Sequence, residues 1–160
     1  MHSKVAMAMV VVLLAAAVGR AGEAPTDPKR VVAGLYAAIS VHNFDTMGRF
    51  LANDFVDHNP NPGQAPGGNG AMHAIDEMYK AFPDLKMQVQ QVVAEGDWVA
   101  ARVFVVGTHK GTWMGIAATG KPFRVGGIDM LKVKNGQVVE RWGFFDTQSL
   151  QQQLSPPAKK

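Results

Sequence analysis

The chain has 160 residues, the length of about one domain, and 47% of them are hydrophobic. It contains no cysteine, which excludes disulfides, thiolate catalysis, zinc knuckles and iron–sulfur clusters. The formal net charge of +3 falls to +1, with 14 basic against 13 acidic residues, if Lys4 and Arg20 leave with the N-terminal segment described next. The charge therefore gives no support for a nucleic-acid partner.

Residues 1–21 have the pattern of a secretory signal peptide. Lys4 precedes the uncharged run "VAMAMVVVLLAAAV", which is too short for a comfortable membrane span, and small residues follow it. We expect cleavage after Ala21 and export of the domain, residues 22–150, to the periplasm or the medium. The mature chain would then have no membrane contact; the alternative is an uncleaved N-terminal anchor.

Three helices are predicted before residue 83. Asp27 is a good N-cap and Pro28 suits the first helical position, so a helix begins there. A second, short helix is expected from Asp45, and a Pro/Gly loop from 59 to 70 separates it from a third that ends before Pro83. The apolar face of the first helix comprises Val31, Val32, Leu35, Ala38 and Ile39.

The period of the hydrophobic pattern changes from helical to two after Pro83. "LKMQVQ" alternates strictly, and further strands are predicted over 98–109, 123–134 and 137–146. Asn135-Gly136 is a strong hairpin turn. "SLQQQL" adds a final helical turn, and we expect a disordered tail over 151–160.

Helices followed by antiparallel strands indicate an α+β fold. We expect the N-terminal helices to pack on one face of a curved antiparallel sheet, which then encloses a pocket between the two layers.

The hairpin directs one carboxyl group toward this interior. If Lys132 and Lys134 face water, Asp129 faces the core, because side chains alternate along a strand. A two-residue turn pairs Asp129 with Trp142 on the same face. A carboxyl group beside an indole should have a raised pKa, as a general acid or base requires. The alternative is a hydrogen-bonded structural aspartate.

Four further polar or aromatic positions are candidates for the site. His109 faces inward if Arg102 faces outward, and His58 and Asn59 end a buried strand before the Pro/Gly loop. Either histidine could instead be an ordinary turn or loop residue, and Asp146 could instead cap the last helical turn. No HExxH, EF-hand or G-x-S-x-G motif is present, so we assign no metal and no serine nucleophile.

Three motifs together resemble the SnoaL-like polyketide cyclases, often called ester cyclases, of the nuclear transport factor 2-like superfamily. They are D-H-N-P with its Pro/Gly loop, G-T-H-x-G-x-W-x-G-I-x-x-T-G, and G-I-D with the ending E-x-W-x-x-x-D. The resemblance runs from about Pro28 to Asp146.

The resemblance implies a cone-shaped fold with a deep apolar pocket, no cofactor, and an intramolecular aldol closure with Asp129 as acid/base. Ketosteroid isomerases are similar here, with a protonated acid at the matching position. His58 and His109 match motif positions and would orient substrate or relay a proton, and the substrate would contact Asn59, Trp113, Trp142 and Asp146. Relatives pair through the open face of the sheet, which suggests a homodimer.

Three functions remain open from the sequence. The first is cofactor-independent acid/base chemistry on a small hydrophobic carbonyl or ester compound. The second is a non-catalytic exported module that binds a hydrophobic small molecule, since an apolar pocket with few polar groups serves either purpose. A third hypothesis is hydrolysis by water that a histidine–aspartate pair activates.

Overall fold

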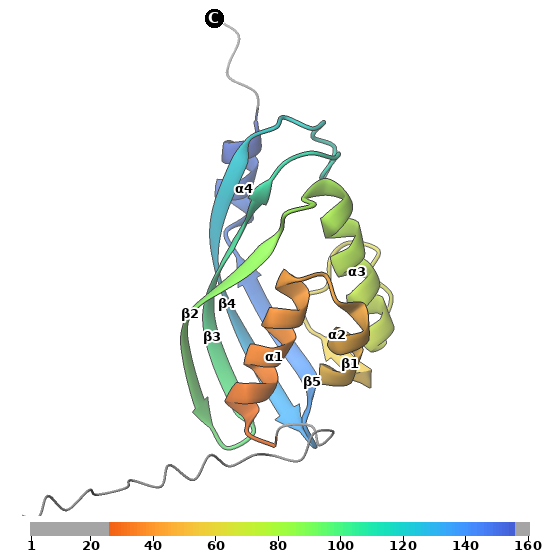
Figure 1. Ribbon diagram of the computed structural model, residues 1–160, viewed down its shortest axis with the longest axis vertical. Helices are drawn as coiled ribbons and strands as arrows, with labels where there is room; N and C mark the ends of the chain where they lie inside the picture. The colour runs from red at the N-terminus through yellow and green to blue at the C-terminus, as the bar shows by residue number, and fades with distance from the viewer. Residues whose placement is uncertain (1–25, 156–160) are drawn as a thin grey trace, which may run out of the picture.

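Figure 1 shows the protein as a computed structural model, in which residues 26–155 are described. The expected signal peptide, its cleavage site and residues 156–160 lie outside this range. Among the described residues, no helix has both the length and the apolar character needed to cross a bilayer.

Five strands form one sheet in the order β1-β5-β4-β3-β2. Their bounds are β1 Leu51–Asp57, β2 Lys86–Glu95, β3 Trp98–Thr108, β4 Pro122–Lys134 and β5 Gln137–Phe145. β2 to β5 form the expected antiparallel sheet, and β1 adds a fifth strand that pairs with β5 in parallel. β2 to β5 follow one another in sequence, and the chain reverses direction at each connection. β1 instead reaches the far edge beside the last strand, where no hairpin dictates its direction.

The first two helices each begin after a side chain that accepts a hydrogen bond from the first turn. Asp27 caps α1 (Pro28–Ser40) as predicted, with its carboxylate 3.0 Å from the Lys29 amide nitrogen. α2 (Phe44–Phe50) begins one residue earlier than expected, because Asn43 Oδ1 accepts from the Thr46 amide at 2.9 Å.

α3 (Gly67–Ala81) begins inside the stretch expected to be loop. Its glycines allow the first turn to lie against neighbouring backbone. A Cβ on Gly68 would be 2.6 Å from the Ala52 carbonyl oxygen, and one on Gly70 would be 1.8 Å from that of Ala65. The glycines therefore serve close packing of the helix start and do not prolong the loop.

α4 (Thr147–Leu154) is longer than the single turn expected, and Leu154 is fully buried in the core. Residues 151–154 are therefore part of the fold, and the expected disordered tail does not begin at 151. The burial of Leu154 stabilises the last turn of α4, although the preceding "QQQ" sequence has no apolar residue that would predict this packing.

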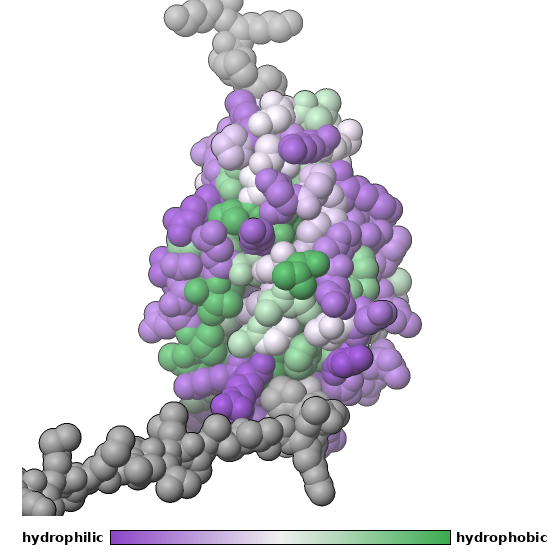
Figure 2. All heavy atoms as spheres, in the orientation of Figure 1, coloured by the Kyte–Doolittle hydropathy of each residue, from purple (hydrophilic) through white to green (hydrophobic). Residues whose placement is uncertain are grey.

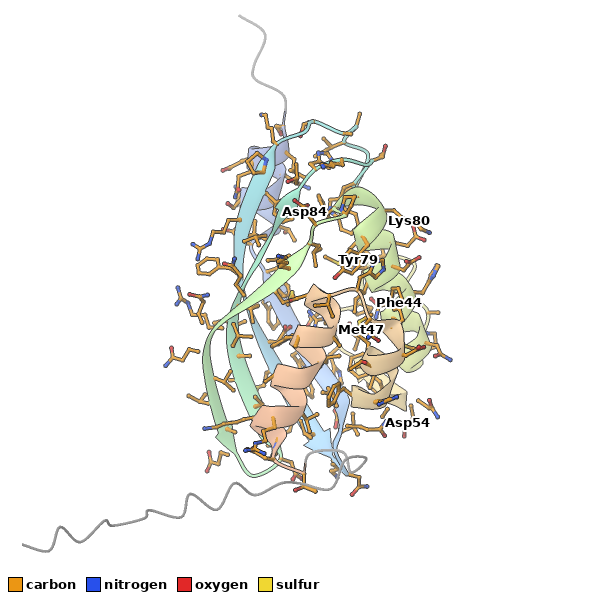
Figure 3. All side chains as sticks on the ribbon, viewed as in Figure 1. Phe44, Met47, Asp54, Tyr79, Lys80 and Asp84 are labelled. Carbon is orange, nitrogen blue, oxygen red and sulfur yellow. The ribbon has the colours of Figure 1, made fainter. Side chains whose placement is uncertain are left out.

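The core lies between the sheet and the helices α1, α2 and α3 (Figure 1). Met47 from α2 is buried there, and Tyr79 from α3 donates its hydroxyl hydrogen to the Ile39 carbonyl of α1 (Figure 3). The surface in the same orientation is mainly hydrophilic with separate apolar patches (Figure 2). The arrangement is the α+β fold expected from the sequence, with a mixed sheet.

Candidate functional site

A one-residue bulge in β5 decides which side chains face the interior. Val133 pairs with Val138, but Lys132 pairs with Glu140, so Val139 is the extra residue. Asp129 consequently lies opposite Gly143 and not opposite Trp142. The predicted pairing of Asp129 with Trp142 was wrong, and Arg141 takes the inward direction in place of the indole.

Asp129 itself is buried as predicted, with 1% of its surface exposed. The Tyr36 hydroxyl of α1 donates to its Oδ2 at 2.8 Å, and Arg141 Nε donates to its Oδ1 at 2.8 Å. Gly143 makes room for this pair, because a Cβ there would be 1.9 Å from Arg141 Nη2. The carboxyl group is thus held by two donors from two different elements.

Arg141 joins Asp129 to a second carboxylate. Its Nη1 donates to both oxygens of Asp57, at 2.9 and 3.2 Å, and Gln64 Nε2 donates to Asp57 at 3.2 Å. The resulting network runs from α1 through the middle of the sheet to the end of β1. We call Tyr36, Asp57, Asp129 and Arg141 the acid network.

Burial and charge act in opposite directions on the groups of the acid network. Burial raises the pKa of Asp129, and the charge of Arg141 and the hydrogen bond from Tyr36 offset this only in part. Burial, followed by the nearby Asp129 charge, raises the pKa of Tyr36 well above its ordinary value. Burial alone would lower the pKa of Arg141, but Asp129 and Asp57 raise it overall. Tyr36 is therefore a neutral donor and Arg141 a permanent cation.

The acid network reaches a cavity of about 220 Å³ at its Asp57 end. The cavity lies between the end of β1 and the loop that leads to α3, and its walls include Phe55, Asp57, Pro60, Gln64 and Pro66. Asp129 is not among its walls and stands behind Arg141. The stretch "DFVDHNPNPGQ" thus forms a cavity wall, with Asp57 as its inward polar group.

His58 and Asn59 lie away from the acid network. Because Asp57 faces inward, His58 faces the other side of the sheet, where it stacks on Trp142 with ring centroids 3.8 Å apart. His58 Nε2 is 3.1 Å from Glu140 Oε2. The side chain of Asn59 is exposed. The structure does not bring His58, Asn59 or Trp142 together with Asp129.

His109 is fully buried, as the alternation from exposed Arg102 predicted. Its Nδ1 is 3.0 Å from Thr119 Oγ1, and its ring packs on Phe82 with a centroid distance of 5.6 Å. Asp129 pairs with Ala101, eight residues before His109 on the same strand path, or about 26 Å at 3.3 Å per residue. His109 and Asp129 therefore belong to different regions of the interior.

The other two residues predicted to contact substrate, Trp113 and Asp146, are also not part of the acid network. Trp113 is partly buried and packs on Phe82 with a centroid distance of 5.3 Å, near His109. Asp146 is exposed and caps α4, accepting from the Ser149 amide at 2.9 Å. Asp146 was predicted either to contact substrate or to cap the last helix, and the structure shows that it caps the helix.

Sequence reasoning missed Tyr36 and Arg141, and it considered Asp57 only as the first residue of the D-H-N-P motif. Tyr36 follows Val32 by four residues and so shares the inner face of α1, which would have identified it as an inward hydroxyl. Asp57 shares the parity of Phe55. No signal in the sequence identifies Arg141, because its direction depends on the bulge.

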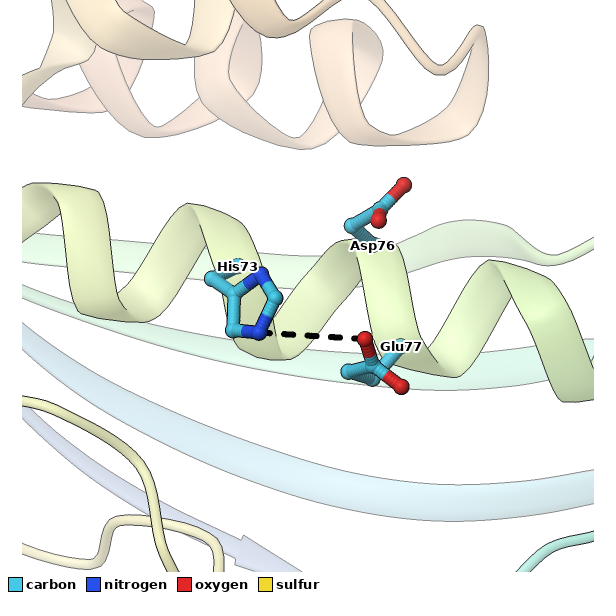
Figure 4. Close-up of side chains that lie close together, drawn as sticks. All are labelled: His73, Asp76 and Glu77. Atoms are coloured by element: carbon cyan, nitrogen blue, oxygen red, sulfur yellow. Dashed lines mark ion pairs between the residues drawn. The ribbon is translucent and has the colours of Figure 1, made fainter.

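A second polar cluster lies on the outside of α3. Figure 4 shows His73 facing Glu77 one turn later, with Asp76 beside them; their candidate ligand atoms lie within 4.8 Å of one another. Lys80 forms ion pairs with Asp76 at 3.5 Å and with Glu77 at 2.5 Å. The cluster is largely exposed, and the ammonium group of Lys80 already pairs with both of its carboxylates. We therefore interpret the cluster as a set of ion pairs on the helix surface.

The cone of helices over a curved sheet, with an inward acid on the fourth strand, defines a small α+β pocket protein. The chain belongs to the SnoaL-like polyketide cyclase family, whose model matches residues 29–154. The family is one of the nuclear transport factor 2-like superfamily.

Solved structures of similar proteins support this assignment. IdmH from Streptomyces antibioticus, a candidate polyketide cyclase, is 34% identical, with 80% of this chain and 98% of that chain covered and a TM-score of 0.72. TsrD from Streptomyces laurentii is 28% identical (79% and 93% covered, TM-score 0.73). AclR from Streptomyces galilaeus, a candidate hydroxylase, is 27% identical (79% and 94% covered, TM-score 0.69). A comparison with curated proteins finds no match.

Proposed function

We propose that this protein catalyses cofactor-independent acid/base chemistry on a small hydrophobic carbonyl or ester compound, of the kind that closes a ring. The single observation that carries the proposal is the buried Asp129, held between the Tyr36 hydroxyl and Arg141. A carboxylate whose pKa is raised by burial is a stronger base near neutral pH than an exposed one. Membership of the polyketide cyclase family supports the same class of reaction.

The proposed reaction moves one proton from a substrate carbon to Asp129 and from there to a substrate oxygen. The carboxylate of Asp129 takes a proton from the carbon next to a substrate carbonyl, and the enolate carbon then attacks a second carbonyl carbon of the same molecule. A carbon–carbon bond forms, and the new alkoxide recovers the proton from the Asp129 carboxyl. No atom is gained or lost, so no co-reactant is needed.

Tyr36 and Arg141 would have different parts in this reaction. A substrate oxygen that accepts the Tyr36 hydroxyl hydrogen replaces Oδ2 of Asp129 as acceptor, which frees that oxygen to act as a base. Tyr36 then stabilises the charge that develops on the enolate oxygen. Arg141 is a positioning residue, because its three hydrogen bonds fix Asp129 relative to Asp57.

The exchange of α-hydrogens for deuterium in 1-tetralone tests the first proton transfer without knowledge of the natural substrate. We expect wild-type protein in D₂O to accelerate exchange, measured by NMR, and Asp129→Asn to lose about 10²- to 10⁴-fold of that rate. The control is Asp54→Asn, which alters an exposed carboxyl on β1. Equal rates for wild type and Asp129→Asn contradict the proposal.

One observation favours a second candidate function, an exported module that binds a hydrophobic molecule without converting it. Protein donors already engage both oxygens of Asp129, and the 220 Å³ cavity meets Asp57 and not Asp129. Native mass spectrometry after purification, followed by incubation, separates the two functions. A compound that is retained unaltered while 1-tetralone exchange stays at the background rate supports binding alone.

We propose in addition that the mature domain is exported and forms a homodimer. The uncharged N-terminal run supports export, and intact-mass measurement of secreted protein should give an N-terminus at Gly22. Exposed Ile128, Met130 and Phe144 form an apolar area on the outer face of β4 and β5, which suits a second copy. Light scattering should give a dimer for wild type and a monomer for Phe144→Asp.

A further inference from the structure

The cavity at the end of β1 has one charged wall. Of the described residues that line it, Asp57 alone has an ionisable side chain, and no lysine or arginine is among them. The side chain of Asp57 is only 8% exposed, so little water screens its charge from the cavity. A molecule in this cavity therefore meets a carboxylate as its nearest charged group.

The order of the charges behind this wall gives the cavity a preference for cations. Arg141 does not line the cavity, and its Nη1 lies 2.9 Å from Asp57 Oδ2. Its Nε in turn donates to Asp129 at 2.8 Å. From the cavity inward the charges are thus negative, positive and negative, and two carboxylates against one guanidinium leave a net charge of −1. A cation in the cavity would complete an alternating row of four charges.

One hydrogen bond of Asp57 comes from a donor that an ammonium group would replace. Arg141 Nη1 donates to both carboxylate oxygens, and the Asn59 amide donates to Oδ1 at 3.1 Å. The fourth contact is Gln64 Nε2, a neutral donor 3.2 Å from Oδ2 on a side chain that also lines the cavity. An ammonium group donates charge-assisted hydrogen bonds, which are shorter and roughly twice as strong. It would therefore displace the Gln64 amide from Oδ2.

The remaining wall suits a small molecule with an apolar body. Phe55, Pro60 and Pro66 supply apolar surface. Gln64 Oε1 accepts from the Asn61 amide at 3.2 Å and has a second lone pair, so it offers a further acceptor beside Asp57. The cavity of about 220 Å³ is smaller than the sites that hold drug-sized ligands. We propose that it binds a small primary ammonium ion that carries a compact apolar group.

This inference goes beyond both functions proposed above, since a neutral hydrophobic compound makes no use of the charge of Asp57. It also requires no proton transfer by Asp129. The bound cation contacts Asp57, and its binding is measured without turnover. The ammonium site can therefore be present whether or not the protein is an enzyme.

Calorimetric titration at pH 8 with benzylammonium and benzyl alcohol tests the site. The two probes have the same ring and differ only in the group that would contact Asp57. We expect saturable binding of benzylammonium, about tenfold tighter than that of benzyl alcohol. Benzoate brings a negative charge to the carboxylate and should not bind measurably. Added salt should weaken the binding of benzylammonium and leave that of benzyl alcohol unchanged.

NMR of ¹⁵N-labelled protein locates the bound molecule. The side-chain amide signal of Gln64 is assigned by its loss in Gln64→Glu. In wild type, benzylammonium should move this signal and the backbone amide signal of Gly67, which also lines the cavity. Both signals should reach a plateau at the concentrations that saturate the calorimetric titration.

Two substitutions change the charge of the wall in opposite directions. Asp57→Asn should abolish the preference for benzylammonium over benzyl alcohol. Asp54→Asn is the matched control, because it alters an exposed carboxylate on the same strand (Figure 3), and it should keep the preference. Gln64→Glu adds a second carboxylate and should tighten benzylammonium binding about tenfold, with a larger rise in melting temperature on addition of the probe than in wild type. This variant keeps Asp57 and Arg141, so it tests the site even if Asp57→Asn does not fold.

Four results would overturn the inference. These are the absence of saturable benzylammonium binding to wild type, equal affinities of wild type for benzylammonium and benzyl alcohol, an unchanged affinity for benzylammonium in Gln64→Glu, and an unchanged preference in folded Asp57→Asn. The last would mean that the cation binds elsewhere, such as at the exposed carboxylates of α3.

Discussion

Replacement of Arg141 by methionine is the sharpest perturbation of the acid network. Arg141 makes three hydrogen bonds to two carboxylates, and the side chains of Asp129 and Asp57 are only 2% and 8% exposed. Methionine fills similar volume but leaves two buried carboxylates without a cation. Removal of one partner of a buried ion pair costs about 3–5 kcal/mol of unfolding free energy, and we expect a loss of that size at pH 8.

The loss of unfolding free energy in Arg141→Met should become smaller at pH 5. This pH dependence distinguishes the loss of the arginine charge from a loss of packing. The pKa of Asp129 is already raised by burial, and Asp57 raises it further once Arg141 no longer opposes them. A raised folded-state pKa gives stability that is complete below the unfolded value, near 3.9, and is lost as pH rises through the folded value. Arg141→Met should therefore lose stability more steeply than wild type between pH 5 and pH 8.

Urea unfolding followed by tryptophan fluorescence measures this at both pH values. The matched control is Lys132→Met, which breaks a pair with Glu140 whose side chains are about one quarter exposed. That pair should contribute less than about 1 kcal/mol. A loss below 1 kcal/mol for Arg141→Met at pH 8, or an equal loss at both pH values, would refute the idea of a charge-balanced buried network.

Three further changes test other parts of the structure. Tyr36→Phe should cost about 1–3 kcal/mol and raise the pKa of Asp129 further, because the lost hydrogen bond favours the carboxylate; carboxyl ¹³C titration would show a fixed pKa if this is wrong. Gly143→Ala should displace Arg141 and cost about 1–3 kcal/mol in urea unfolding. Gly126→Ala, whose Cβ would be no nearer than 3.5 Å to its neighbours, should be nearly neutral, and equal costs would contradict the close approach at Gly143. Asp27→Ala should lower stability by about 1 kcal/mol through the lost cap of α1, and an unchanged melting temperature would count against that.

The parts of the fold that follow local rules could be predicted from the sequence. Asp27 and Pro28 marked the start of α1, and Asn135-Gly136 marked the hairpin between β4 and β5. The inward direction of His109 followed from Arg102, because β3 and β4 pair without interruption over this length. Side-chain alternation transmits such information reliably only where the register is regular.

Errors arose where tertiary contacts override local pattern. Trp142 was placed beside Asp129 because a regular hairpin has no extra residue, and nothing in "GQVVERW" announces the bulge at Val139. Tyr36 was overlooked because a tyrosine on an apolar helix face usually serves the core. Residues 151–154 were assigned to the tail because the polar sequence around Leu154 conceals its buried contact with the core.

The bulge at Val139 also bears on how this interior could be altered in evolution or design. If the unaltered β5 sequence paired with β4 without a bulge, Trp142 would lie opposite Asp129 and Arg141 would turn toward solvent. The same amino acids would then form an apolar interior with an isolated acid in place of a charge-balanced one. Deletion of Val139 would remove the bulge but leave Arg141 facing inward, because Lys132 would still pair with Glu140. The register of a single hairpin, and not its composition, thus sets the polarity of this interior.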